Sequence, residues 1–217
     1  EVSGSRISRE DFAAYITQVS DVIAAMTKDG YPHPTAFEIE TAVAFLFFKK
    51  ENCDLVLLEV GMGGNLDATN IIKNTLLAVL VSISMDHMSF LGNTLAQIVE
   101  KKAGIIKDGC RVVTARQKPE AMQVIERISR EHGAKCTIAD ASEAEVLKES
   151  CLGQTIRYRG EAYEIPLAGV YQKENAVVAL NALKVLDELG FPTAAEQKKE
   201  GLRTVNWNGR FTVICKK

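Results

Sequence analysis

The sequence lacks the features that define several large classes of protein. Its longest uninterrupted apolar run, residues 42–48, has seven residues, whereas a membrane-spanning helix needs about 18 or more. We therefore expect no membrane-spanning segment. The chain also has no large excess of one charge, because its 26 Lys and Arg residues nearly balance its 28 Asp and Glu residues and leave a net charge of −2. Without a global positive field, nucleic acid is not an expected partner.

Cysteine is present but lacks any pairing pattern. The five cysteines are odd in number, lie far apart and never form a C-x-x-C pair, which argues against a disulfide framework or a zinc ribbon. The chain also opens without the charged-then-apolar leader of a signal peptide. Together these features predict a cytoplasmic protein.

Strands and helices alternate along the 217 residues, with no internal repeat and no linker-like change of composition. Apolar periodicity, turn residues and capping pairs such as Thr35 with Glu38 define the expected elements. We expect helices at residues 8–26, 35–50, 94–106, 119–132, 142–150, 172–189 and 193–203, strands at 54–60, 76–83, 111–114 and 135–138, and a β-hairpin at 154–165. This alternation predicts one compact α/β unit with a doubly wound, mostly parallel sheet flanked by helices, plus a small β-hairpin element.

Glycines 61, 63 and 64 follow directly after the strand expected at residues 54–60. Backbone amides that are not crowded by a Cβ can close on an anion, so the segment could be a phosphate or ligand loop. The spacing is neither G-x-G-x-x-G nor the Walker pattern, and neither pattern occurs elsewhere in the chain. Spacing alone therefore leaves a tight strand-to-loop turn as an equal alternative.

Polar residues that follow two expected strands are candidates for a metal site. Glu59 closes an apolar strand, where a buried carboxylate needs a cation or hydrogen bonds for compensation. His87 follows the next strand, and the carboxyl ends of neighbouring parallel strands meet at one edge of the sheet. Imidazole is a common metal ligand. The ordinary alternative for His87 is a core or capping histidine, and for Lys102 it is a solvated basic face shared with Lys101 and Lys107.

Two further polar residues have simple structural explanations when they are considered alone. Asn175 lies where a helix opens and could be an ordinary polar residue of the first turn. Arg210 lies in an Asn-Gly-Arg turn and could be an exposed cation.

Eight motifs occur in the order found in one enzyme family. They are Thr35-Ala-Phe-Glu38, Glu59-Val-Gly-Met-Gly-Gly64, Asp67-Ala-Thr-Asn70, Asp86-His87, Leu91-Gly-Asn-Thr94, Lys102-Ala-Gly-Ile-Ile-Lys107, Gln172-x-x-Asn175 and Trp207-x-Gly-Arg210. Over residues 35–211 the chain resembles the folylpolyglutamate synthase/dihydrofolate synthase family of the Mur ligase superfamily. The resemblance implies the central, P-loop-type domain of an ATP-dependent ligase, which adds L-glutamate to folate or dihydropteroate through an acyl phosphate.

The resemblance also implies roles for individual residues. Glu59 and His87 match magnesium ligands, and Lys102 matches a catalytic lysine that is carbamylated and helps to hold a second metal. Gln172 and Asn175 match contacts to the adenine side of ATP. By the same resemblance, Arg210 matches an arginine that meets the ATP phosphates. Metal and fixed cations suit this chemistry, because negative charge develops on phosphates and on a tetrahedral intermediate.

The chain departs from the family pattern at several points. Lys101 stands where the family usually has Glu, which bears on carbamylation of Lys102, and Asn65 stands where the family often has Arg. The family's glycine-rich ATP loop and its carboxy-terminal glutamate-ligase domain are expected outside residues 1–217. We therefore expect a partial ATP-binding domain that is inactive on its own.

Two alternatives remain open at this stage. One is a Mur-type ligase that acts on peptidoglycan precursors, and the other is a non-catalytic nucleotide-binding or interaction module. In the favoured interpretation the partners are small molecules, namely ATP, L-glutamate and a folate or dihydropteroate. No oligomeric state is predicted.

Overall fold

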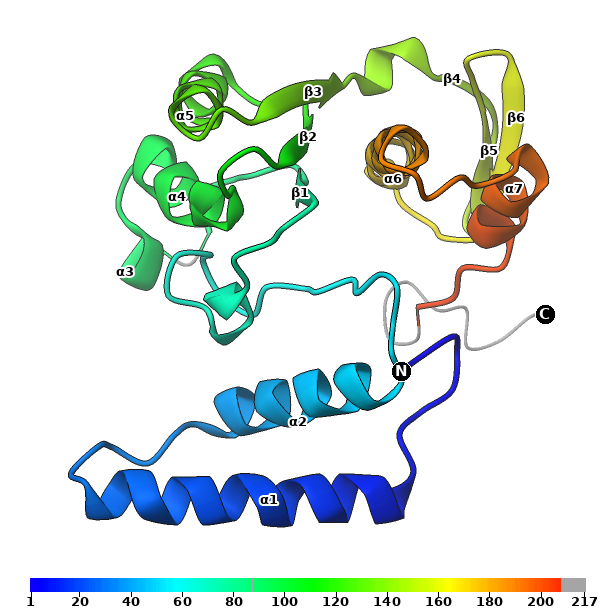
Figure 1. Cartoon of the computed structure of the whole chain (residues 1–217). Helices are drawn as coiled ribbons and strands as arrows, with labels where there is room; N and C mark the ends of the chain where they lie inside the picture. The colour runs from blue at the N-terminus through cyan, green and yellow to red at the C-terminus, as the bar shows by residue number, and fades with distance from the viewer. Residues whose placement is uncertain (87, 208–217) are drawn as a thin grey trace. The chain divides into compact units, whose positions relative to one another are not determined.

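The computed structural model describes residues 1–86 and 88–207 (Figure 1). The chain forms two compact units, Glu1–Ile72 and Lys73–Lys217, rather than the one compact unit predicted from the sequence. Two candidate site residues, His87 and Arg210, lie outside the described residues. Within the described part of the chain, no helix has the length and apolar character needed to cross a membrane.

The first unit is built around a pair of helices, α1 (Arg9–Lys28) and α2 (Ala36–Lys50), followed by the 3-10 turn η1 (Ala68–Ile71). The Thr35 side chain accepts a hydrogen bond from the Glu38 amide, and the Glu38 carboxylate accepts one from the Thr35 amide, which confirms the predicted capping box. The two helices are also joined by Lys50, whose Nζ lies 2.6 Å from Asp11 Oδ1.

The second unit contains the predicted parallel sheet. Its strands β1 (Leu77–Leu80), β2 (Arg111–Ala115) and β3 (Lys135–Ala139) are parallel and lie in the order β1-β2-β3. Around them are α3 (Met88–Leu91), α4 (Leu95–Lys102), η2 (Ala103–Ile105), α5 (Pro119–Glu131) and α6 (Gln172–Glu188). Helices α4 and α5 cover one face of the sheet and α6 covers the other (Figure 1). The predicted doubly wound α/β architecture is therefore confirmed.

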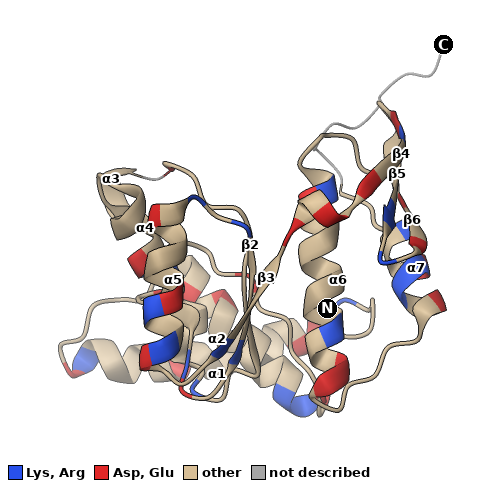
Figure 2. Ribbon diagram, turned by 90° about the horizontal axis from the view of Figure 1, so that it is seen from above, with Lys and Arg blue, Asp and Glu red and all other residues tan. Residues whose placement is uncertain are grey.

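Two apolar cores explain why helices cover both faces of this sheet. Alternate residues of β2 point to opposite faces, as the strand period requires. Val112 packs with Val99 of α4 and Ile125 of α5 in one core, whereas Val113 packs with Val177 of α6 in the other. Helix α5 carries both acidic and basic residues (Figure 2), and Arg127 forms ion pairs with Glu131 and Glu100.

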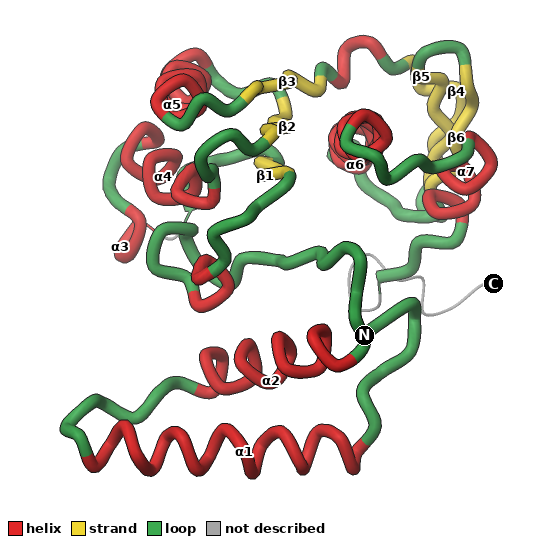
Figure 3. Tube along the Cα trace, viewed as in Figure 1, coloured by secondary structure: helices red, strands yellow, loops and turns green. Residues whose placement is uncertain are grey.

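A second, antiparallel sheet consists of β4 (Glu145–Ser150), β5 (Gly153–Tyr158) and β6 (Glu161–Ile165). It lies beside α6, and α7 (Ala195–Arg203) lies against β6 (Figure 3). Strands β5 and β6 confirm the predicted hairpin at residues 154–165. The helix predicted at residues 142–150 is wrong, because after the short turn η3 (Ala141–Glu143) the chain pairs with β5 as an edge strand. Here pairing overrides the helical propensity of the local sequence.

The strand predicted at residues 54–60 is also absent. No described residue pairs with this segment in a strand ladder. Leu57, at its centre, is 92% exposed. An apolar run becomes a strand only when a neighbouring backbone satisfies its amides and carbonyls, and the local sequence does not contain that partner.

Candidate functional site

The glycine segment after Glu59 closes around a carboxylate that belongs to the chain itself. Asp67 Oδ2 accepts a hydrogen bond from the Met62 amide at 2.9 Å. Its Oδ1 accepts two from Thr69, at 3.0 Å from the amide and 2.6 Å from the hydroxyl. A Cβ built on Gly61 would lie 2.8 Å from Cζ of Phe37, so a larger residue here would force the exposed Phe37 ring to shift. The motifs at 59–64 and 67–70 are therefore parts of one closed loop.

Asp67 takes the place that an anionic ligand could have taken at this loop. Burial of the Asp67 carboxyl opposes ionisation, but hydrogen bonds from Thr69 and from backbone amides, including that of Met62, outweigh burial and lower its pKa. Because the carboxylate engages the Met62 amide, the tight-turn interpretation of the glycine segment describes this structure better than the phosphate-loop interpretation.

Glu59, the first predicted magnesium ligand, is solvent-exposed rather than buried at a strand end. An exposed carboxylate is accessible to an ion, and carboxylate oxygens are donors that Mg²⁺ prefers. Glu59 belongs to the unit Glu1–Ile72 and Lys102 to the unit Lys73–Lys217. Because His87 lies outside the described residues, convergence of these three side chains on one ion stays a prediction.

The three lysines near the end of α4 have different environments. Lys102 is the last residue of the helix and is half-buried. Lys101 is exposed, and its Nζ donates to the Phe90 carbonyl of α3 at 2.5 Å. Lys107 Nζ donates to the Gly104 carbonyl at 3.1 Å. A uniform solvated basic face therefore does not describe these residues.

The structure brings the two predicted adenine-side residues together. Gln172 and Asn175 lie in the first turn of α6, and Asn175 Nδ2 donates to Gln172 Oε1 at 3.2 Å. Gln172 is half-buried and Asn175 is exposed, so both side chains are accessible. This pair forms within one helix turn, which the i, i+3 spacing already indicates.

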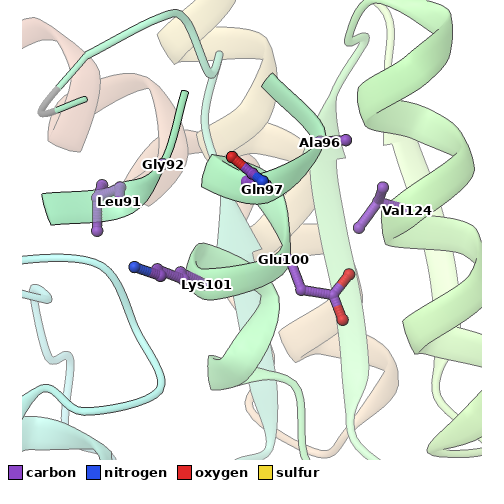
Figure 4. A pocket seen from close by; sticks show the side chains of 7 residues that line it. All are labelled: Leu91, Gly92, Ala96, Gln97, Glu100, Lys101 and Val124. Carbon is purple, nitrogen blue, oxygen red and sulfur yellow. The ribbon is translucent and has the colours of Figure 1, made fainter. Parts of the chain in front are cut away.

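A surface hollow of about 490 Å³ lies beside α4 and was not predicted from the sequence. It is lined by Leu91, Gly92, Ala96, Gln97, Glu100, Lys101 and Val124 (Figure 4). Glu100 and Lys101, its two charged side chains, are already engaged with Arg127 and with the Phe90 carbonyl. Of the predicted site residues that the structure describes, namely Glu59, Lys102, Gln172 and Asn175, none lines this hollow.

Comparison with known proteins first defines the class. The sequence profile of the Mur ligase middle domain matches residues 11–183. The chain belongs to the Mur ligase middle domain family. This agrees with the doubly wound parallel sheet and confirms the resemblance drawn from the motifs.

The particular relatives are folate enzymes. The chain is 36% identical over 223 residues to the dihydrofolate synthase/folylpolyglutamate synthase of Bacillus subtilis, covering 98% of this chain and 51% of the relative. A solved Mycobacterium tuberculosis folylpolyglutamate synthase, complexed with ADP and AMPPCP, is 32% identical, with a TM-score of 0.80 over 95% of this chain and 49% of that one. A complex of FPGS, a folylpolyglutamate synthase, with AMPPCP and folate is 28% identical, with a TM-score of 0.79 over 91% and 50%. The chain thus spans about half the length of the relatives it matches.

Proposed function

We propose that this chain is the partial ATP-binding domain of a cytoplasmic ligase that adds L-glutamate to folate or dihydropteroate. The 36% identity to a dihydrofolate synthase/folylpolyglutamate synthase across 98% of the chain is the main support. The similar folds solved with AMPPCP, an ATP analogue, and with folate support ATP and a folate-type acid as the ligands. A ligase of peptidoglycan precursors would share the domain family, but these relatives favour folate.

In the proposed reaction, a carboxylate oxygen of the folate or dihydropteroate attacks the γ-phosphorus of ATP and ADP leaves, which produces an acyl phosphate. The amino group of glutamate then attacks the acyl carbon, loses a proton to solvent, and inorganic phosphate leaves as the amide forms. Both steps concentrate negative charge. The residues of the chain must therefore place cations and hydrogen-bond donors around the phosphates.

In this proposal the chain's residues have three roles. Glu59, His87 and carbamylated Lys102 hold magnesium, which when bound neutralises phosphate charge. Carbamylation joins the Lys102 nitrogen to carbon dioxide and releases two protons from the ammonium group, so a cation becomes an anionic oxygen donor of the kind that Mg²⁺ prefers. Gln172 and Asn175 orient the adenine side of ATP. Arg210 meets the ATP phosphates, where a guanidinium can form paired hydrogen bonds.

The decisive test is glutamate-dependent ADP release by the complete ligase that contains this sequence, with dihydropteroate and tetrahydrofolate supplied separately. Glu59→Gln should lower kcat by about a hundredfold or more, because loss of one fixed electrostatic contact at such a centre has effects of this order. Glu51→Gln, which removes another exposed carboxylate of the same unit, is the matched control and should keep normal turnover.

Three results would contradict the proposal. Near-normal activity of Glu59→Gln would remove the metal assignment. Full turnover by the 217-residue chain alone would contradict the partial-domain assignment. Nucleotide binding by a complete protein without glutamate-dependent ADP release would instead favour a non-catalytic module.

A further inference from the structure

One face of β5 runs alongside α6 with a polar side chain at each end. Gln154, Ile156 and Tyr158 alternate along the strand and are 6%, 0% and 3% exposed. Ile156 and Tyr158 share an apolar core with Val177 of α6. A buried polar side chain on such a face needs a hydrogen-bond partner, and both Gln154 and Tyr158 find theirs on the chain segment that contains α6.

At one end of this face, Gln154 is tied to the start of α6. Its Nε2 donates to the Gly169 carbonyl at 3.0 Å. The same carbonyl accepts the backbone amide of Gln172, also at 3.0 Å. A carbonyl oxygen has two lone pairs and can serve both donors. Gly169 has a φ of 117°, a left-handed conformation that favours glycine. The turn that presents this carbonyl therefore depends on glycine at position 169.

At the other end, Tyr158 is tied to the middle of α6. Asn181 is 1% exposed, and its Nδ2 donates to the Tyr158 hydroxyl at 3.1 Å and to the Val177 carbonyl at 2.8 Å. Arg159 completes the contact by donating from Nη2 to Asn181 Oδ1 at 3.3 Å. The buried Asn181 side chain is therefore bonded through both its nitrogen and its oxygen.

The two contacts hold α6 at separate points. Gln154 donates to the Gly169 carbonyl just before the helix, and the Tyr158 hydroxyl accepts from Asn181 in its middle. A slide of the helix along β5 by one turn, about 5.4 Å, would break both hydrogen bonds.

The first turn of α6 needs such support, because its N-cap residue, Tyr171, makes no side-chain capping hydrogen bond. The first amides of a helix have no partner within the helix, so an uncapped end frays. Here the amide of Gln172 is held by the Gly169 carbonyl, and that of Asn175 by the Tyr171 carbonyl at 3.1 Å. Gln154 secures the first of these acceptors from outside the helix.

We propose that Gln154 is a positioning residue for Gln172 and Asn175, which it orders through the Gly169 carbonyl without contacting nucleotide itself. This rests on the proposed function for the nucleotide role of that pair. Loss of the Gln154 amide would leave the fold and the chemical step in place. It would loosen the turn from which the two adenine-side residues project, and so weaken ATP binding.

The first measurement needs no nucleotide. Gln154→Met keeps an unbranched side chain of similar length and removes the donor. It should speed amide hydrogen exchange at Gln172 and Asn175 by about tenfold, roughly what one buried hydrogen bond is worth, and leave Val185 unchanged. Tyr158→Phe is the matched control, because it removes the hydroxyl at the far end of the same strand face and should leave Gln172 and Asn175 unchanged.

Equal exchange at Gln172 in Gln154→Met and wild type would overturn the proposal. If Gln154→Met does not fold, Gln154→Leu serves in its place. Its side chain also lacks a donor for the Gly169 carbonyl, so the same local acceleration is expected.

The second measurement uses the complete ligase. Gln154→Met should raise KM for ATP by about tenfold and change kcat by less than about twofold, whereas Tyr158→Phe should change neither. Equal increases in KM for ATP in Gln154→Met and Tyr158→Phe would overturn the proposal, because they would show that Gln154 acts only on the stability of the fold. A wild-type ligase without ATP-dependent turnover would overturn the proposed function, and with it the nucleotide role of Gln154. The exchange data would still decide whether Gln154 orders the turn.

Discussion

Asp140 joins the carboxyl ends of β2 and β3. Arg116 follows β2 and Asp140 follows β3, and Arg116 Nη2 lies 2.6 Å from Asp140 Oδ2. Asp140 Oδ1 also accepts the Ser142 amide at 2.9 Å. The Arg116 hydrogen bond, followed by those from Ser142, lowers the pKa of Asp140 to about 2. One carboxylate thus fixes both the sheet edge and the turn that leads into β4.

This geometry predicts an acid-sensitive contact. The unfolded carboxyl titrates near 3.8 and the folded one at about 2. The unfolded chain therefore takes up the proton first as the pH falls. The stabilisation from Asp140 is complete above about 3.8 and disappears as the pH falls through about 2. Arg116→Gln should raise the pKa of Asp140 toward 3.8, as measured by carboxyl NMR titration and urea unfolding between about pH 2 and 5.

Arg127→Gln is the matched control for this prediction. Arg127 pairs with Glu131 and Glu100 and not with Asp140, so its removal should leave the Asp140 titration unchanged. A wild-type Asp140 that titrates at its ordinary value would contradict the assignment.

At the scale of elements, α3 depends on side chains of α4. A four-residue helix is far too short to be stable alone. Lys101 Nζ donates to the Phe90 carbonyl at 2.5 Å, and Gln97 Oε1 accepts the Asn93 amide at 2.9 Å. Lys101, the departure from the family pattern, thereby joins the segment that follows His87 in sequence to the helix that ends in Lys102.

Removal of the hydrogen bond from Lys101 to the Phe90 carbonyl should destabilise α3 selectively. Lys101→Met should increase hydrogen exchange at the Gly92 amide, which donates to the Met88 carbonyl, by roughly three- to tenfold, as expected for loss of about 1 kcal/mol. Lys101→Glu, which restores the usual family residue, should have the same effect because a carboxylate cannot donate to a carbonyl.

Lys107→Met is the control for α3, because Lys107 donates only a few residues back, to Gly104. If Gly92 exchanges at the same rate in Lys101→Met and wild type, Lys101 does not hold α3. Adding magnesium and bicarbonate to each variant then tests whether the anchoring of α3 affects the predicted metal site.

The accuracy of the sequence predictions depended on how local the determining contacts are. Helix α5 was predicted at 119–132 and spans Pro119–Glu131, because periodicity and proline at its first position lie within the helix. Strand β2 was predicted nearly as well. The two failures, at residues 54–60 and 142–150, are segments whose structure depends on whether a distant backbone pairs with them.

The same distinction applies to the candidate site. The spacing of Gln172 and Asn175 correctly predicts that they share a helix turn. The hydrogen bond from Gln154 to Gly169 spans 15 residues, and the pairing of β5 with β6 brings its two ends together. The role of Asp67 was missed for a similar reason, although its motif was recognised. The closure of the loop decides from which donors the carboxylate accepts hydrogen bonds. Residue types alone do not determine how the loop closes.

At the scale of the whole molecule, the two units differ in how much apolar surface they bury. Among the described residues of Glu1–Ile72, only Val43 and Phe47 are buried hydrophobic side chains, and α1 has no buried residue. Both hydrophobic clusters belong entirely to Lys73–Lys217. Short chains with small cores are marginal, because burial must exceed the conformational entropy lost on folding.

This difference predicts unequal behaviour of the separated units. A protein of residues 73–217 should unfold cooperatively in urea and keep near-native circular dichroism, because both cores and both sheets are intact. Residues 1–72 alone should show little stable structure beyond fraying helices. Ile125→Ala, which opens a cavity in one core, is the control and should destabilise residues 73–217 and the whole chain alike, by about 2–5 kcal/mol. If residues 1–72 unfold cooperatively by themselves, more apolar surface is buried there than Val43 and Phe47 provide.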